Sequence, residues 1–311
     1  MKKLTQFKKT AIQNWNDFWF KPLDLLPVSL FRFLFLSFLF VFYGVRYLDY
    51  DVIYTDMGFL PYRSLALIIP KESLSALPLE WLVKGDPTGR ILYFILLIGL
   101  LLWAFGLLKR KFTFLVFLLH LAFFKRNPLM SYGADMVATF WLMYLCLVKN
   151  DQVSPLTSLF KMGRLGDSLS TVGCRFIQIQ LCIIYAYAGI DKAQSAKWWQ
   201  GSVLWDIFSN PQITPFDLTF LHHVPVLLVL FSLLSWFWEI YFPVLVWLPK
   251  WKPWVLGFGL GMHTTIAFAM GLPFFSLFMA LSYLLFIPAQ TLEGFLQKLL
   301  KRLHLNPTEF S

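Results

Sequence analysis

Charged residues are scarce in this chain. Asp, Glu, Lys and Arg make up 14% of its 311 residues, whereas soluble domains carry about 25%. A soluble protein of this length needs more charge on its surface, so the composition excludes a soluble enzyme, a disordered chain and a coiled coil. Hydrophobic residues make up 58%. The two fractions together indicate a polytopic membrane protein.

Acidic residues are scarcer than basic ones, which gives a net charge of +10. In a soluble protein such an excess is typical of nucleic-acid binding. In a membrane protein it is typical of cytoplasmic loops, which are rich in Lys and Arg. We therefore expect the lipid bilayer, and no nucleic acid, as a partner.

Cysteine is rare, and the patterns of common catalytic and metal sites are absent. The three cysteines, Cys146, Cys174 and Cys182, lie in or beside apolar runs and have no metal-ligand spacing. We expect buried thiols and no metal site. The chain also lacks the sequence fingerprints of serine hydrolases, zinc proteases, P-loop NTPases and dinucleotide-binding enzymes.

Long apolar runs dominate what is present. A helix needs about 20 residues to cross the bilayer core of about 30 Å, and a helix satisfies all its backbone hydrogen bonds internally. Residues 254–288 are too many for one span and are predicted to turn at Gly271-Leu272-Pro273. The runs predict an all-α bundle of eight transmembrane helices: residues 28–48, 91–108, 112–124, 132–148, 176–190, 224–249 and two within 254–288.

Residues 2–22 mix Lys with Trp and Phe, which predicts an amphipathic helix on the inner leaflet. With the N-terminus inside, the inner segments carry roughly twice as many Lys and Arg residues as the outer ones, which favours cytoplasmic termini. We expect a multi-pass protein of the inner (plasma) membrane. Its regions would be the amphipathic segment 1–24, a transmembrane domain 25–290 and a cytoplasmic tail 291–311.

The run 175–201 carries the most informative polar residues. Gln178, Tyr185 and Lys192 are spaced by seven, so they share one face of a helix. Gly189 lies close to that face and allows another backbone to approach. A lysine that is partly shielded from water there can serve as a general base. The structural alternative is a snorkelling lysine that pairs with the neighbouring acid, Asp191, or with a lipid phosphate.

A second polar stretch, residues 125–135, joins two short apolar runs. Asn127-Pro128 breaks the helix there, and Asp135 begins the next run. One interpretation is that Asn127 and Asp135 line an outward-facing pocket together with Lys192 and Tyr185. The other is a simple loop followed by an acid at a helix N-terminus, which the helix dipole favours.

Two more ionisable residues stand alone in apolar runs. Glu239 and His263 each lie inside a predicted span, and His263 is preceded by Gly257, Gly259 and Gly261, which suit tight packing. Ionisable groups inside a membrane bundle are functional candidates. Structural hydrogen bonds are the alternative for both.

Three segments give the chain a resemblance to the HTTM family, the membrane module of the vitamin K-dependent gamma-carboxylases and their shorter bacterial relatives. They are RNPLMSYGAD, QIQLCIIYAYAGIDKAQSAKWWQG and GMHTTIAFAMGLPFFSLFMALSYLLF, and the second is the most specific. The first apolar run, with its internal arginine, also fits. The resemblance covers most of residues 25–290.

The resemblance implies site residues and a cofactor. Lys192 matches the lysine that acts as base on a reduced quinone of the vitamin K type, and His263 matches a histidine of a later membrane segment. Pro128 stands where the carboxylases have a histidine, and the large luminal domain of the carboxylases is not matched.

Two functions follow as expectations. The first is a carboxylase-like lyase with Lys192 and His263 as catalytic residues. It would modify a peptide or lipid-like substrate bound by Asn127, Asp135, Tyr185, Gln178 and Glu239. The second is a non-enzymatic factor for the maturation, export or immunity of a secreted peptide. A transporter is disfavoured, because the sequence shows no inverted repeat.

Overall fold

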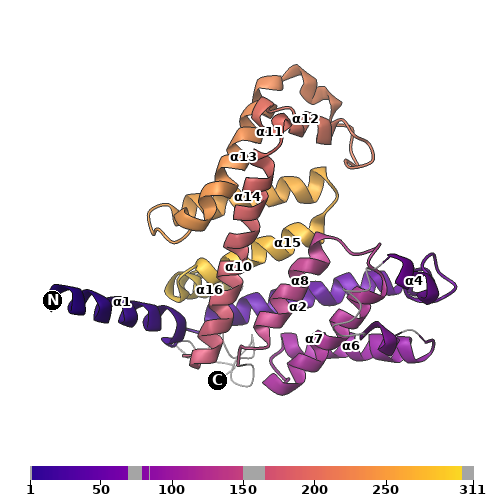
Figure 1. Ribbon diagram of the computed structural model, residues 1–311, viewed down its shortest axis with the longest axis horizontal. Helices are drawn as coiled ribbons and strands as arrows, with labels where there is room; N and C mark the ends of the chain where they lie inside the picture. Colours follow the sequence, from indigo (N-terminus) through magenta and orange to yellow (C-terminus); the bar gives the residue numbers. More distant parts are fainter. Residues whose placement is uncertain (1, 69–78, 84, 150–164, 303–311) are drawn as a thin grey trace. The chain divides into compact units, whose positions relative to one another are not determined.

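The computed structural model describes residues 2–68, 79–83, 85–149 and 165–302 (Figure 1). Within these ranges the chain is helical, which confirms the all-α prediction. Three short segments, η1 Leu79–Val83, η2 Thr219–His223 and η3 Ser282–Phe286, are 3-10 helices. The α-helices are α1 Lys2–Phe20, α2 Leu26–Tyr47, α3 Tyr50–Tyr54, α4 Tyr62–Ile68, α6 Thr88–Ala104, α7 Arg110–Arg126, α8 Gly133–Leu145, α10 Ser168–Ala193, α11 Ala196–Gln200, α12 Val203–Phe208, α13 Pro225–Leu245, α14 Lys252–Ala269, α15 Pro273–Leu281 and α16 Ala289–Arg302.

Three helices in the described part of the chain are long and apolar enough to cross a membrane: α2, α10 and α13. The number becomes four if the helices on either side of Ile287-Pro288 are counted as one broken span. This pattern indicates a multi-pass membrane protein. The prediction of eight spans is wrong.

Helix length explains much of the difference between the eight predicted spans and the three or four candidate spans of the structure. Helix α8 has 13 residues and therefore rises about 20 Å, less than the bilayer core of about 30 Å. Helix α6 has 17 residues. Helix α7 also has 17 but carries basic residues at both ends, and α15 has 9. An apolar run can thus be as long as a span and still not fold as one straight helix.

The described chain divides into two compact units. The first comprises residues 1–176 and 287–311, and the second comprises residues 177–286. Helix α10 begins in the first unit and ends in the second. Of the predicted C-terminal tail 291–311, residues 291–302 belong to α16, and residues 303–311 lie outside the described part.

Aromatic side chains form much of the core of the first unit. Helix α6 packs against both α2 and α7. The ring of Tyr93 on α6 lies 4.8 Å from that of Phe123 on α7 and 5.6 Å from that of Tyr43 on α2. Trp103 and Trp141 are fully buried. Edge-to-face aromatic pairs of this kind stabilise a core beyond the area that they bury.

Polar contacts hold the start of α10 in the first unit. Ser170 N donates to Asp167 Oδ1 at 2.8 Å, and Arg110 Nη2 donates to Asp167 Oδ2 at 2.8 Å. Burial raises the pKa of Asp167, but the hydrogen bonds from Ser170 and Arg110 outweigh it and hold that pKa below its usual range. Thr171 Oγ1 donates to the Lys21 carbonyl at 3.0 Å. The last bond links the segment after α1 to α10, and the bond from Arg110 links α7 to the residue before α10.

The end of α1 also contacts α10. Arg175 Nε donates to the Phe18 carbonyl at 3.0 Å, and the rings of Trp19 and Phe176 lie 5.5 Å apart. Trp15, one turn earlier, is exposed. The helical prediction for this segment is confirmed, whereas its location on the inner leaflet stays a prediction.

In the second unit, α13 packs against α11, α12 and α14, and α14 packs against α15. A Cβ atom at Gly189 on α10 would lie 2.8 Å from Ile240 Cγ1 and 3.0 Å from Ile240 N on α13. The indole of Trp236 donates to the Gly189 carbonyl at 2.9 Å. The predicted close approach of another backbone at Gly189 is confirmed.

Candidate functional site

Lys192 forms an ion pair with Glu239 in the second unit. Lys192 lies at the end of α10 and Glu239 lies inside α13. The ammonium contacts both carboxylate oxygens. The pair is formed between residues 47 apart in the sequence, and not with the neighbouring Asp191. A charged pair in an apolar bundle needs such mutual compensation.

The pair is largely shielded from solvent. The Glu239 side chain is 7% exposed and the Lys192 side chain 22% exposed. The ammonium also lies 4.9 Å from the ring centroid of Trp198 on α11, a cation–π distance. The lysine is therefore enclosed by a carboxylate and an indole but keeps limited access to its surroundings.

A chain of hydrogen bonds centred on Tyr185 lies in the same unit. The Tyr185 hydroxyl is 2.6 Å from His263 Nε2 on α14 and 2.7 Å from the Tyr283 hydroxyl on η3. All three side chains are buried. His263 Nδ1 is also buried and has no hydrogen-bond partner among the described residues. One nitrogen of the imidazole is thus oriented by Tyr185, while the other has no partner among the described residues.

Aromatic residues next to Glu239 on α13 contact Tyr185, the centre of these hydrogen bonds. Glu239 lies between Trp238 and Phe242 in the sequence of α13. The rings of these two residues lie 4.7 and 4.5 Å from the ring of Tyr185. We call Lys192, Glu239, Tyr185, His263 and Tyr283 the lysine–histidine cluster.

Gln178 has a structural contact. Its Nε2 donates to the Leu285 carbonyl at 2.7 Å, and its side chain is buried. Leu285 lies in η3, where the bonds of an irregular helix leave carbonyls to be satisfied by other groups. The amide therefore links α10 to η3, and a substrate-binding role for Gln178 stays a prediction.

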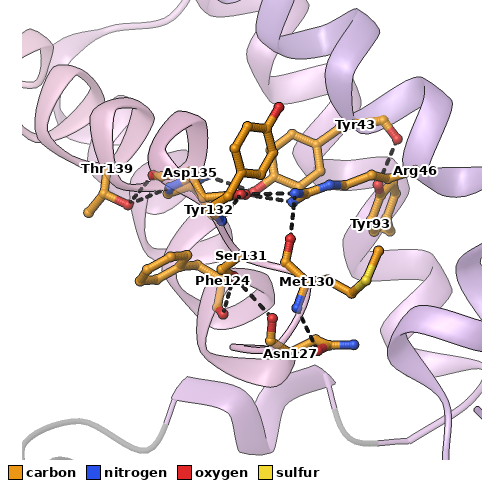
Figure 2. A network of polar contacts seen from close by, with 11 residues as sticks. Tyr43, Arg46, Tyr93, Phe124, Asn127, Met130, Ser131, Tyr132, Asp135 and Thr139 are labelled. Atoms are coloured by element: carbon orange, nitrogen blue, oxygen red, sulfur yellow. Dashed lines mark hydrogen bonds and ion pairs between the residues drawn. The ribbon is translucent and has the colours of Figure 1, made fainter. Parts of the chain in front are cut away.

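Asp135 lies in the first unit, where it pairs with Arg46 of α2 (Figure 2). Arg46 Nη1 and Nη2 donate to the two carboxylate oxygens at 2.5 and 2.9 Å. The carboxylate also accepts from Tyr132 N at 3.1 Å, which caps α8. Arg46 Nη2 further donates to the Met130 carbonyl at 3.1 Å. Asp135 thus links α2, α8 and the turn before α8.

Asn127 shapes the same turn. Its Nδ2 donates to the Ile53 carbonyl at 2.6 Å, and its Oδ1 accepts from Met130 N at 3.2 Å. Ser131 Oγ donates to the Asn127 carbonyl at 3.0 Å, as Figure 2 shows. Both amide atoms therefore satisfy backbone groups. Substrate binding by Asn127 stays a prediction.

A buried histidine of the first unit is also satisfied. His120 Nδ1 is 2.7 Å from the Tyr43 hydroxyl, and His120 Nε2 is 2.9 Å from Thr139 Oγ1. The Tyr93 hydroxyl in turn donates to the Tyr43 carbonyl at 2.6 Å. With both ring nitrogens engaged, His120 has the structural role that a lone buried histidine usually has.

Sequence reasoning missed two partners. Arg46 was visible as a charge at the end of an apolar run, but nothing in the local pattern assigned it to Asp135, 89 residues away. Tyr283 lies in a largely apolar segment beside Ser282, and nothing in the local pattern distinguished it from the other hydroxyl residues of that run. Among the described residues no group of three or more His, Cys, Asp or Glu is placed to hold a metal ion.

Gly259 on α14 makes room for the lysine–histidine cluster. A Cβ atom there would lie 2.4 Å from the Tyr283 hydroxyl oxygen and 2.5 Å from Trp238 Cζ2, whereas Gly257 and Gly261 have open space around them. Close packing was expected at all three glycines and, of these three, is found at Gly259 alone.

We expect Gly259→Ala to destabilise the protein by about 1–3 kcal/mol through overpacking.

Gly257→Ala is the matched control, since the same change on the same helix meets no atom within 4 Å. It should be neutral or stabilise by up to about 1 kcal/mol. Thermal unfolding in detergent compares the two variants. Equal effects would contradict the close packing at Gly259.

Comparisons of the chain with protein-family models, with curated proteins and with solved structures find no match.

Proposed function

We propose that this chain is a membrane enzyme that uses the lysine–histidine cluster for proton transfer on a peptide or lipid-like substrate. The observation that carries the proposal is the ion pair of Lys192 with Glu239, placed beside Tyr185 and its bond to His263. Buried ionisable groups are costly in an apolar bundle, and those that persist there mark functional sites by default.

The geometry supports one order of proton movements. An ammonium has no lone pair, so Lys192 becomes a base only after it has given a proton to Glu239, which contacts it directly. His263 Nδ1, which is buried and has no hydrogen-bond partner among the described residues, would be the second group of the cluster to exchange a proton with a substrate. Lys192 would accept the proton, Glu239 would control its charge, and Tyr185 would orient the imidazole.

The HTTM resemblance belongs to this proposal, and with it a reduced quinone as cofactor and a carboxylase-like reaction. The rings of Trp198 near Lys192 and of Trp238 and Phe242 near Tyr185 provide the aromatic surroundings that suit a flat, apolar ring. A location in the plasma membrane is likewise proposed, on the basis of the apolar spans and the charge pattern.

Peptides released by the organism that encodes the chain provide the test. A gene deletion is complemented with the wild type, Lys192→Ala or Lys192→Arg, and secreted peptides are compared by mass spectrometry. A carboxylase-like enzyme replaces a hydrogen of the peptide by a carboxyl group, so a modified peptide gains the mass of CO2. Lys192→Ala should abolish the modification while the protein still inserts. An unchanged modification would refute the base role.

Lys192→Arg separates the enzyme from the alternative, a binding factor for peptide maturation, export or immunity. The observation that favours the alternative is that Lys192 is already paired, since a paired ammonium can simply hold two helices together. Arg preserves the pair but stays protonated. A binding factor should therefore tolerate Arg, whereas a base mechanism should fail. Loss of a peptide, without any mass change, would also indicate the binding factor.

A further inference from the structure

Helix α16 carries two apolar stripes. Leu292, Leu296 and Leu300 recur every four residues and are buried, and the helix packs against α2. Phe295 and Leu299 form a second pair, one turn apart, that is 64% and 41% exposed. By helix geometry this second stripe lies directly beside the buried one. Packing within the first unit therefore covers only part of the apolar surface of α16.

Basic residues continue around the helix beyond the exposed stripe. Lys298 and Arg302 follow Phe295 and Leu299 by three residues, and Lys301 lies further around. All three cations are exposed. Glu293 is the single acidic residue of α16. In the direction around the helix, the surface thus changes from buried apolar, to exposed apolar, to basic.

We propose that this exposed face of α16 lies on an anionic lipid surface. Phe295 and Leu299 would enter the boundary between headgroups and acyl chains, and the three cations would reach lipid phosphates. Charge complementarity favours anionic lipid over a neutral surface, because each basic residue near such a membrane adds about 1 kcal/mol of attraction. Since α16 packs against α2, a candidate membrane span, it is held close to a bilayer in any case.

This inference does not depend on the proposed enzymatic function. It assigns α16 to the membrane surface rather than to a tail in the cytoplasm or to half of a broken span. Interfacial helices of this type are recognised by an apolar stripe flanked by Lys and Arg. Helix α1, with Lys residues in its first half and Trp15 exposed, has a similar composition.

The experiment uses the full chain in lipid nanodiscs. Phe295→Cys is labelled with an environment-sensitive fluorophore, and Gln297→Cys, about 160° away on nearly the opposite face of the helix, is the matched control position. Unmodified protein gives the labelling background, since Cys174 and Cys182 are buried and Cys146 is half-buried. Quenching is measured with nitroxide lipids and with aqueous iodide, in phosphatidylcholine discs with and without phosphatidylglycerol.

We expect nitroxide lipids to quench the label at position 295 several-fold more than the label at position 297, with the larger difference in phosphatidylglycerol discs. Changing Lys298, Lys301 and Arg302 to Gln should remove the advantage of the anionic discs. Equal lipid quenching at both positions would overturn the proposal. Protection of position 295 from both quenchers would also overturn it, because a protein partner would then cover the face.

Discussion

Asp135→Asn should destabilise the first unit by about 3–5 kcal/mol, the cost of removing one partner of a buried ion pair. The Asp135 side chain is completely buried, and the Arg46 side chain is 13% exposed. Asn keeps one oxygen as an acceptor, but its amide nitrogen can only donate. It cannot neutralise a guanidinium that loses two charge-assisted bonds of 2.5 and 2.9 Å at once.

The remaining contacts of Arg46 do not compensate for that loss. Its guanidinium would keep the bond to the Met130 carbonyl and its position 4.0 Å from the ring centroid of Phe42. Neither group carries the negative charge that a buried cation requires. Asn also weakens the cap of α8, because a neutral oxygen replaces the carboxylate that accepts from Tyr132 N.

The matched control is an exposed ion pair of the same chain. Lys197 and Asp206 are 2.7 Å apart, with side chains 66% and 43% exposed. Lys197→Gln should cost about 0–1 kcal/mol. Denaturant unfolding in detergent, followed by tryptophan fluorescence, compares the two variants. If Asp135→Asn costs no more than Lys197→Gln, the pair with Arg46 does not stabilise the unit.

The parts of the fold that the sequence predicts are those set by local pattern. The long apolar runs around α2, α10 and α13 predict helices there, because hydropathy and helix geometry act over neighbouring residues. The helical N-terminal segment and the close approach at Gly189 also follow from local composition.

The number of spans could not be obtained in this way. Hydropathy measures how apolar a run is, but helix length depends on where capping and packing end each helix. Asn127-Pro128 ends α7, and the segment 112–124 is only part of a helix that carries charges at both ends. The run 254–288 turns between α14 and α15, as predicted at Gly271-Leu272-Pro273, but α15 has only 9 residues and is followed by the 3-10 helix η3 instead of continuing as one long helix.

Contacts between side chains that are far apart in the sequence also could not be predicted. The local alternative for Lys192 was Asp191, whereas its partner Glu239 is 47 residues away. Likewise, the helix-terminus interpretation of Asp135 is confirmed by its bond to Tyr132 N, but its ion pair with Arg46 depends on how α2 and α8 pack. Periodicity along one helix cannot identify a partner on another.

Lys192→Met and Glu239→Met should each destabilise the second unit by about 3–5 kcal/mol, while the double variant should recover most of that loss. Each single change leaves one buried charge without its partner. Replacing both charges with apolar side chains of similar volume removes the desolvation cost together with the attraction, and such replacements are often neutral or stabilising. The double variant is therefore expected to fold like the wild type.

The double variant, Lys192→Met with Glu239→Met, is also the control for the test of secreted peptides. If the lysine–histidine cluster transfers protons, the double variant should fold and yet leave every secreted peptide unmodified, because neither Met can hold a proton. If the double variant folds and the peptides stay modified, the pair serves only to hold α10 and α13 together. If instead it is less stable than either single variant, the two side chains do not compensate each other, and the pairing that carries the proposed function is wrong.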